Sequence, residues 1–169
     1  LGAAWKISGS GWSGNRLALP YEALRIQMQA LAQSDEPINR ALLLTIGDPL
    51  MRAARANFSR NVLASGGFVC TENQHSIDLE ASVTFAKELQ PSVVVLCGGD
   101  ADYLATGAEW LNAIHSALPQ AILLLAGKPE GWEKLKENGI SEPLFAGMDR
   151  VAFLQKLLEK LTEGKEGRP

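Results

Sequence analysis

The chain has few cysteines, no excess of positive charge and no long apolar run. Its two cysteines are too few for a disulfide framework. The 19 acidic residues outnumber the 16 basic ones, so no basic surplus exists to attract nucleic acid. The longest apolar runs, such as residues 121–126, are too short to cross a bilayer, and no signal peptide opens the sequence. These absences predict a cytoplasmic protein, and a first residue that is not methionine indicates a piece of a longer chain.

The usual signatures of nucleotide binding and of catalysis are missing as well. The sequence contains no G-x-G-x-x-G or G-K-[ST] loop and no G-x-S-x-G elbow. Neither cysteine has a histidine nearby in the sequence, so a catalytic cysteine–histidine pair could form only if the fold brings the two together. His75 is expected in a solvated loop without a second metal ligand, and His115 on the surface of a helix. We therefore expect no metal site and no catalytic residue in this domain.

Short apolar runs alternate along the chain with apolar stripes at helical spacing. The 169 residues suffice for one domain with a sizeable core. Unbroken apolar runs of this length are typical of strands buried on both faces. The expected strands are residues 41–46, 68–70, 93–97, 122–126 and 143–146. Helices are expected between and around these strands. They are residues 20–32, residues 51–65, a helix with a possible cap at Ser76, residues 104–118, residues 132–138 and a last helix capped by Asp149.

This alternation predicts a flavodoxin-like, doubly wound α/β domain. Right-handed crossovers favour a parallel sheet of five strands in the order 2-1-3-4-5, covered by helices on both faces. We assign this domain to residues 40–162, after an N-terminal arm with one helix (1–39) and before a charged, mobile tail (163–169). The arm contains Trp5 and Trp12, and we expect both indoles to pack on the domain or on a neighbouring chain.

Ligands of such folds bind beyond the carboxyl ends of the strands, near the point where the strand order reverses. The segments to inspect are therefore residues 47–53, 98–100 and 127–129. Each also has a structural interpretation. Asp48, followed by a proline, fits the cap and first position of a helix, and Asp100 fits the cap of the next helix. The glycines suit tight turns, although glycine also lets a phosphate approach the backbone.

From residue 16 to residue 161 the sequence resembles the carboxyl-terminal region of methylmalonyl-CoA mutases. Five segments carry the resemblance by their order and spacing: RLALPYE (16–22), AARANFSRNVLASGG (53–67), CGGDADY (97–103), LLAGKP (124–129) and LFAGMD (144–149). The family's large subunit binds cobalamin through Asp-x-His-x-x-Gly after the first strand. Here Asp48 matches the aspartate, but Leu50 stands at the histidine position and Ala53 at the glycine position.

This departure removes the cobalt ligand that the family uses. Leucine has no lone pair, so Leu50 cannot replace the histidine. Ala53 adds a methyl group where glycine leaves room for the nucleotide tail of the cofactor, and Pro49 stiffens the loop. We expect no bound cofactor, with local side chains filling the crevice and Leu50 facing the apolar interior or packing nearby. The vestigial cofactor positions are Asp48, Leu50, Ala53, Gly98, Gly99 and Gly127.

The chain looks like the terminal domain of the family's small subunit, which lacks the cobalamin site. The resemblance implies a heterodimer in which the large subunit carries cobalamin, substrate and the radical interconversion of methylmalonyl-CoA and succinyl-CoA. This domain would then be non-catalytic and act in assembly. An alternative is a module that binds cobalamin or another small ligand without histidine ligation. Cys70 and Cys97 end strands that the expected order separates, so we expect both thiols to be reduced and buried, and Tyr103 to pack over the adjacent loop.

Two other functions on the same topology do not fit the sequence. A signalling receiver domain needs an acid pair after the first strand, an aspartate ending the third and a lysine after the fifth. The chain has the single Asp48, Cys97 and Ala146-Gly147 at these places. A flavodoxin needs a Ser/Thr-rich phosphate loop after the first strand, which is missing here.

Overall fold

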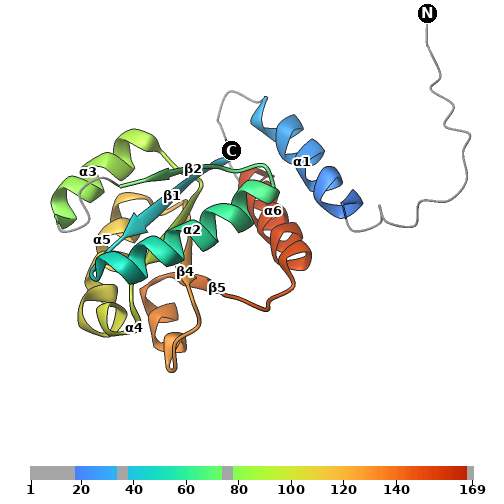
Figure 1. The fold of residues 1–169 in the computed structure, drawn as a ribbon. Coiled ribbons are helices and arrows are strands. Elements are labelled where there is room, and N and C mark those ends of the chain that lie inside the picture. The colour runs from blue at the N-terminus through green and yellow to red at the C-terminus, as the bar shows by residue number, and fades with distance from the viewer. Residues whose placement is uncertain (1–17, 34–37, 74–77, 167–169) are drawn as a thin grey trace, which may run out of the picture.

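A computed structural model of the chain describes residues 18–33, 38–73 and 78–166. Helices and strands alternate throughout this part of the chain (Figure 1). The elements are α1 (Leu19–Ala32), β1 (Arg40–Thr45), α2 (Pro49–Ser65), β2 (Val69–Glu72), α3 (Leu79–Leu89), β3 (Val93–Cys97), α4 (Asp100–Asp102), the π-helical turn η1 (Tyr103–Gly107), α5 (Ala108–Ala117), β4 (Ile122–Ala126), the 3-10 helix η2 (Trp132–Asn138), β5 (Ile140–Leu144) and α6 (Arg150–Glu166).

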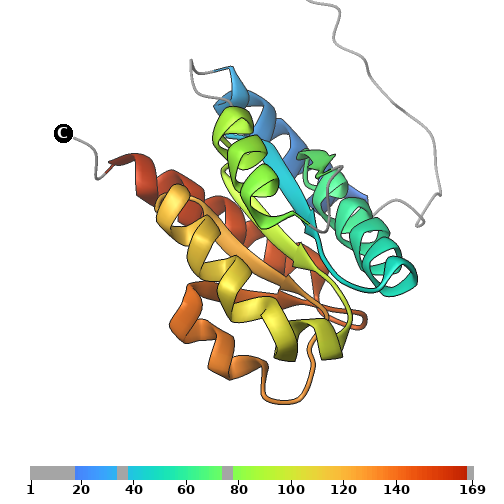
Figure 2. The same cartoon turned by 90° about the vertical axis from the view of Figure 1, so that its left-hand side faces the viewer.

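The sheet confirms the predicted fold class. Five parallel strands follow the order β2-β1-β3-β4-β5, as in flavodoxin-like proteins. Helices α1, α2 and α6 cover one face, and α3, α5 and η2 cover the other (Figure 2). All six core residues expected from the sequence are at most 2% exposed: Leu42, Leu44, Val94, Leu96, Leu123 and Leu125. The two buried faces explain why the strands read as unbroken apolar runs.

Strand β5 begins three residues earlier than predicted, at Ile140 instead of residue 143. Gly139 ends η2 with a φ of +96°, and the chain then enters the strand at once. The strand lies at the edge of the sheet, and its polar residues Ser141 and Glu142 hide it from a search for apolar runs. The second strand likewise extends to Glu72 rather than ending at residue 70.

The predicted apolar stripe that begins at Leu104 is interrupted at its start. Residues 103–107 form a π-helical turn, which turns the side chain of Tyr103 and the backbone of Gly107 toward the core. Leu104 is 86% exposed as a result. A π-turn contains an extra residue per turn, and this shifts the phase of the helix.

Helix α6 has its predicted cap, whereas α3 begins at Leu79 with Asp78 as its cap, two residues after the predicted Ser76. Asp149 caps α6 by accepting a hydrogen bond from the Ala152 N–H at 3.0 Å. The helix continues to Glu166, past the predicted domain end at residue 162. At the cap of α3, Asp78 accepts from the Ala81 N–H at 3.0 Å. Within the described ranges, none of the helices combines the length and apolar character that a membrane span requires.

Helix α1 packs on the domain beside α6 (Figure 1). Its buried residues Leu24 and Met28 belong to the same core as α2 and α6. A Cβ placed on Gly67 would lie 3.2 Å from the Met28 Cγ, which shows how closely α1 approaches the α2–β2 turn. The sequence predictions for Trp5, Trp12, His75 and Ser76 lie outside the described residues.

Candidate functional site

The carboxyl ends of β1, β3 and β4 lie side by side at the point where the strand order reverses. Thr45 pairs with Cys97, and Leu96 pairs with Leu125. The segments that follow these strands are therefore neighbours, as the sequence predicted. This carboxyl edge is the candidate site.

Asp102 joins the loops that follow β1 and β3. Its Oδ2 accepts hydrogen bonds from the Asp48 N–H at 3.1 Å and from the Gly99 N–H at 2.8 Å. A Cβ on Gly47 would lie 1.9 Å from the Asp102 Cγ, and Gly47 has a φ of +68°. The expected cap role of Asp100 is thus wrong, because Asp102 reaches the free N–H groups at the start of this helix.

Tyr103 ties the ends of β3 and β4 together beneath these loops. Its buried hydroxyl accepts from the Gly98 N–H at 2.9 Å. The same hydroxyl donates toward the carbonyl oxygens of Ala126 at 2.7 Å and Leu96 at 3.0 Å. Burial raises the pKa of Tyr103 far above its ordinary value, with a further contribution from Cys97, so the hydroxyl remains a donor. The sequence predicted packing over a loop but not this hydrogen-bonding role.

Arg55 crosses the edge from α2 to the end of β4. Its guanidinium donates to the Ala126 carbonyl oxygen at 2.7 Å and pairs with Asp100 at 2.5 Å. It also lies over the Tyr103 ring, 5.3 Å from the centroid. A Cβ on Gly127 would lie 2.5 Å from the Arg55 Nη1. Side chains from α2, α4 and η1 thus span the crevice between the strand ends.

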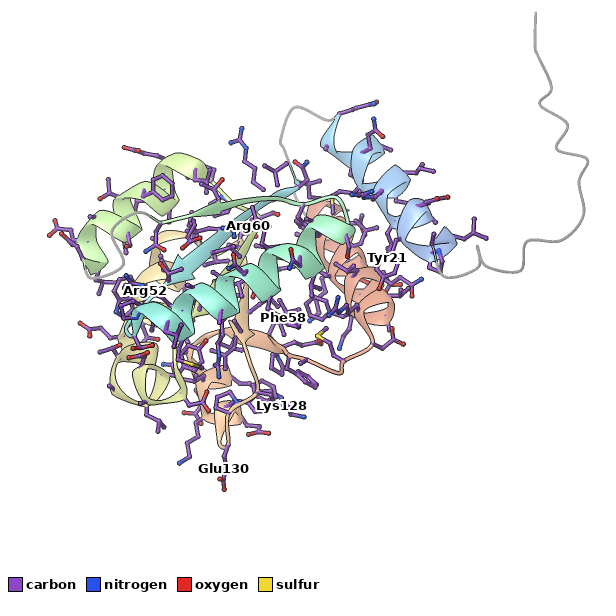
Figure 3. All side chains as sticks on the ribbon, in the orientation of Figure 1. Tyr21, Arg52, Phe58, Arg60, Lys128 and Glu130 are labelled. Carbon is purple, nitrogen blue, oxygen red and sulfur yellow. The ribbon has the colours of Figure 1, made fainter. Side chains whose placement is uncertain are left out.

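Leu50 does not contribute to this filling, so the prediction that it packs toward the apolar interior is wrong. Its side chain is 78% exposed. Leu50 is the second residue of α2, after Pro49, and lies in the first turn of the helix. Figure 3 shows the amino end of α2, marked by Arg52, at the rim of the domain. Ala53 is exposed on the same helix.

The remaining vestigial positions have structural explanations. Asp48 is the N-cap of α2, as predicted, and its Oδ1 accepts from the Met51 N–H at 2.8 Å. A Cβ on Gly98 would lie 2.8 Å from the Ile46 Cγ1, and one on Gly99 would lie 3.0 Å from the Asp102 Oδ2. The chain's own packing therefore accounts for the glycines at this edge.

The turn after β4 projects outward. Lys128 is exposed, and its Nζ lies 5.1 Å from the centroid of the Phe145 ring. Figure 3 shows Lys128 and Glu130 at the outer end of this segment. Gly127 has a φ of +92°, a conformation that glycine adopts without strain.

The cysteines and the described histidine offer no nucleophile. Both thiols are free, and β1 separates their strands as predicted. Burial raises the pKa of Cys97 to about 12 and that of Cys70 to about 11. Cys70 is only partly buried, so its predicted full burial is wrong; it lies on an edge strand. His115 is exposed as expected, and the described residues contain no cluster of three or more metal-ligating side chains.

Two open pockets lie outside the crevice between the ends of β1, β3 and β4. One of about 420 Å³ lies at the amino ends of the strands, between Pro91 and Leu118. The other, of about 440 Å³, lies beside β5 and is lined by Trp132 and Phe153. Lys128 lines the second pocket, whereas residues 47–53 and 98–100 line neither of the two.

Comparison with solved structures shows the fold. The chain is similar to a CheY-like protein, TadZ, from Pseudomonas aeruginosa PAO1, with a TM-score of 0.55, 17% identity, and coverage of 73% of this chain and 99% of that one. It is also similar to a CheY-like receiver domain protein from Methanospirillum hungatei JF-1, with a TM-score of 0.52, 14% identity, and coverage of 78% and 99%. At these identities the likeness concerns the architecture alone.

Comparison of sequences confirms the resemblance noted from the motifs. No family model matches the chain. The chain is 32% identical over 127 residues to the methylmalonyl-CoA mutase small subunit of Porphyromonas gingivalis strain W83. The match covers 75% of this chain and 19% of that relative, so the chain spans about a fifth of the relative's length. The chain is therefore a flavodoxin-like α/β domain that is similar in sequence to part of a methylmalonyl-CoA mutase small subunit.

Proposed function

We propose that the chain is a non-catalytic domain of the small subunit of a heterodimeric methylmalonyl-CoA mutase. It acts in the cytosol through assembly with the large subunit, which carries cobalamin, substrate and the isomerisation. The observation that carries this proposal is the 32% identity to a methylmalonyl-CoA mutase small subunit.

The chemistry of the carboxyl edge supports a domain that does not ligate cobalt. A cobalt ligand needs a lone pair, and Leu50 presents only hydrocarbon where the family's motif has histidine. His115 is the histidine within the described ranges. A Cβ on Gly139, just before β5, would lie 3.2 Å from its Nδ1, so His115 lies at the opposite edge of the sheet.

The hydrogen bonds at the same edge support the loss of a channel for a cofactor tail. A ligand entering between β1, β3 and β4 would displace Arg55 from the Ala126 carbonyl and Asp102 from two backbone N–H groups. Each buried group left without a partner costs about 1–3 kcal/mol. The residues present therefore do not fit cobalamin.

Exposed apolar side chains at this edge support a role in contacts with another protein. Leu50, Met51 and Leu104 are all exposed, and a Cβ on Gly99 would lie 3.6 Å from the Met51 Cβ, so Met51 borders the loop after β3. Exposed apolar side chains that lie together on a protein surface often mark a site where another protein binds.

Calorimetric titration with cobalamin tests the loss of the cofactor site. We expect no binding at micromolar concentrations, either by the chain itself or by the variant with Leu50→His and Ala53→Gly. The double variant gains little because Arg55 and Asp102 still cross the crevice. Micromolar binding by the unaltered chain would contradict the proposal and favour a module that binds without histidine ligation.

Co-expression with the large subunit tests the assembly role. Deletion of residues 20–161 from the small subunit should lower the yield of heterodimer and the mutase activity together. Leu50→Asp with Leu104→Asp should weaken co-purification, whereas Gln155→Asp, which adds charge to an exposed face of α6, should not. Unchanged yield and activity after the deletion would refute the assembly role, and activity of the small subunit alone would refute the whole assignment.

A further inference from the structure

Helix α1 has two apolar faces, and the described part of the domain covers one of them. Leu24 and Met28 are buried against the core. On the other side, Leu19 is 58% exposed and Ile26 is 68% exposed. Figure 3 shows α1 at the outside of the domain, with Tyr21 on the side that faces α6. The exposed apolar face therefore points away from the core.

Four residues form this exposed face, which we call the α1 stripe: Leu19, Ala23, Ile26 and Ala30. At 100° per residue they lie within about 60° of one another, roughly opposite to the buried face. Their spacing of four, three and four residues is that of the apolar seam of a coiled coil. This spacing indicates that the partner of the stripe is another helix.

The order of side-chain sizes in the stripe makes it complementary to itself in an antiparallel pair. When two copies of α1 run in opposite directions about a twofold axis, Leu19 of one faces Ala30 of the other, and Ala23 faces Ile26. Each layer then contains one large and one small side chain, which allows close packing of the two helices. A parallel pair would instead place the large residues against each other.

The charges beside the stripe favour the same arrangement. Glu22 and Arg25 are exposed on one flank of α1, and no ion pair joins them in the described part of the chain. In the antiparallel pair this flank faces its own copy, with Glu22 about 3 Å along the axis from the partner's Arg25. In a parallel pair, this flank would face the opposite flank of the partner, so Glu22 and Arg25 would not meet. The antiparallel pair therefore joins opposite charges.

We propose that two copies of this chain associate through their α1 stripes, packed as an antiparallel helix pair. This inference does not rest on the proposed function, because it follows from α1 alone. The helix is about 21 Å long, so the contact is smaller than the ~800 Å² per partner of a standard stable interface. We expect a weak dimer with a dissociation constant of about 10⁻⁴ M.

Sedimentation equilibrium of the 169-residue chain tests the pairing. The weight-average mass should rise from monomer toward dimer between about 10 μM and about 1 mM, around the expected dissociation constant. Ile26→Glu should keep the chain monomeric, because it places two like charges in the centre of the contact. Gln27→Glu adds the same charge to α1 outside the stripe and should leave the dimer intact. Circular dichroism of both variants confirms that they remain folded.

Disulfide trapping tests the orientation. In a Cys70→Ser background, a mixture of Leu19→Cys and Ala30→Cys chains should form the mixed disulfide in preference to either homodisulfide. A monomer at all concentrations, or a predominance of homodisulfides, would overturn the proposal. If Ile26→Glu instead abolished only binding to a mutase large subunit, the stripe would belong to that partner and the self-association would be wrong.

Discussion

The Tyr103 hydroxyl offers the sharpest test of how the carboxyl edge is held together. Tyr103→Phe keeps the ring in place and removes only the oxygen that accepts from the Gly98 N–H at 2.9 Å and donates toward the Ala126 and Leu96 carbonyls. The Ala126 oxygen keeps its bond from Arg55 at 2.7 Å. The Gly98 N–H loses its described partner in a buried position.

The expected cost follows from that unpaired N–H. A buried donor without a partner costs about 1–3 kcal/mol, and we expect the variant to lose about 2 kcal/mol in the free energy of unfolding. For a domain of this size, 1 kcal/mol corresponds to about 2–4 °C in Tm. The midpoint of thermal unfolding should therefore fall by about 4–8 °C.

Urea titration followed by circular dichroism measures this difference against a matched control. Tyr21→Phe removes a hydroxyl that has no hydrogen bond to the described residues, on a half-buried tyrosine of α1. It should change the free energy of unfolding by less than about 0.5 kcal/mol. If Tyr103→Phe proved as mild as Tyr21→Phe, the hydroxyl would not be a structural tie and the account of the carboxyl edge would be wrong.

Three further predictions concern backbone strain, titration and the place of α1. Gly47→Ala should cost more than about 3 kcal/mol in urea unfolding, because its Cβ would lie 1.9 Å from the Asp102 Cγ. Gly131→Ala shares the positive φ but meets nothing within 4 Å, so it should cost only about 1–2 kcal/mol; equal costs would exclude a clash. The pKa of Cys97 is raised to about 12 in the folded chain, so the stability that its thiol contributes is present at pH 8 and lost as the pH rises toward 12. Between pH 8 and 10 the wild type should lose about 2 kcal/mol more than Cys97→Ala; parallel pH profiles would contradict this. Met28→Ala should destabilise the whole domain by about 2–5 kcal/mol in a single transition, whereas a separate early transition would show that α1 unfolds independently.

Local sequence patterns were enough to determine the architecture of this protein. Apolar runs of strand length alternate with helical stripes, and only a parallel sheet with two covered faces buries all of them. The caps at Asp48 and Asp149 could also be predicted, because a cap depends on residues within one helical turn. The missing cobalt ligand at position 50 is likewise a property of one residue type, and the resemblance to a mutase family rests on short ordered segments.

Only the tertiary structure decided how the carboxyl edge is filled. Arg55 meets a carbonyl 71 positions away, at Ala126, and Asp102 meets the Asp48 N–H 54 positions away. No local pattern encodes such pairs, because they depend on which strand ends the fold brings together. The exposure of Leu50 and the phase shift at Leu104 have the same origin. Moving the start of a helix by one residue rotates each of its side chains by about 100° around the helix axis. The burial of an apolar side chain therefore depends on where its helix begins relative to the sheet.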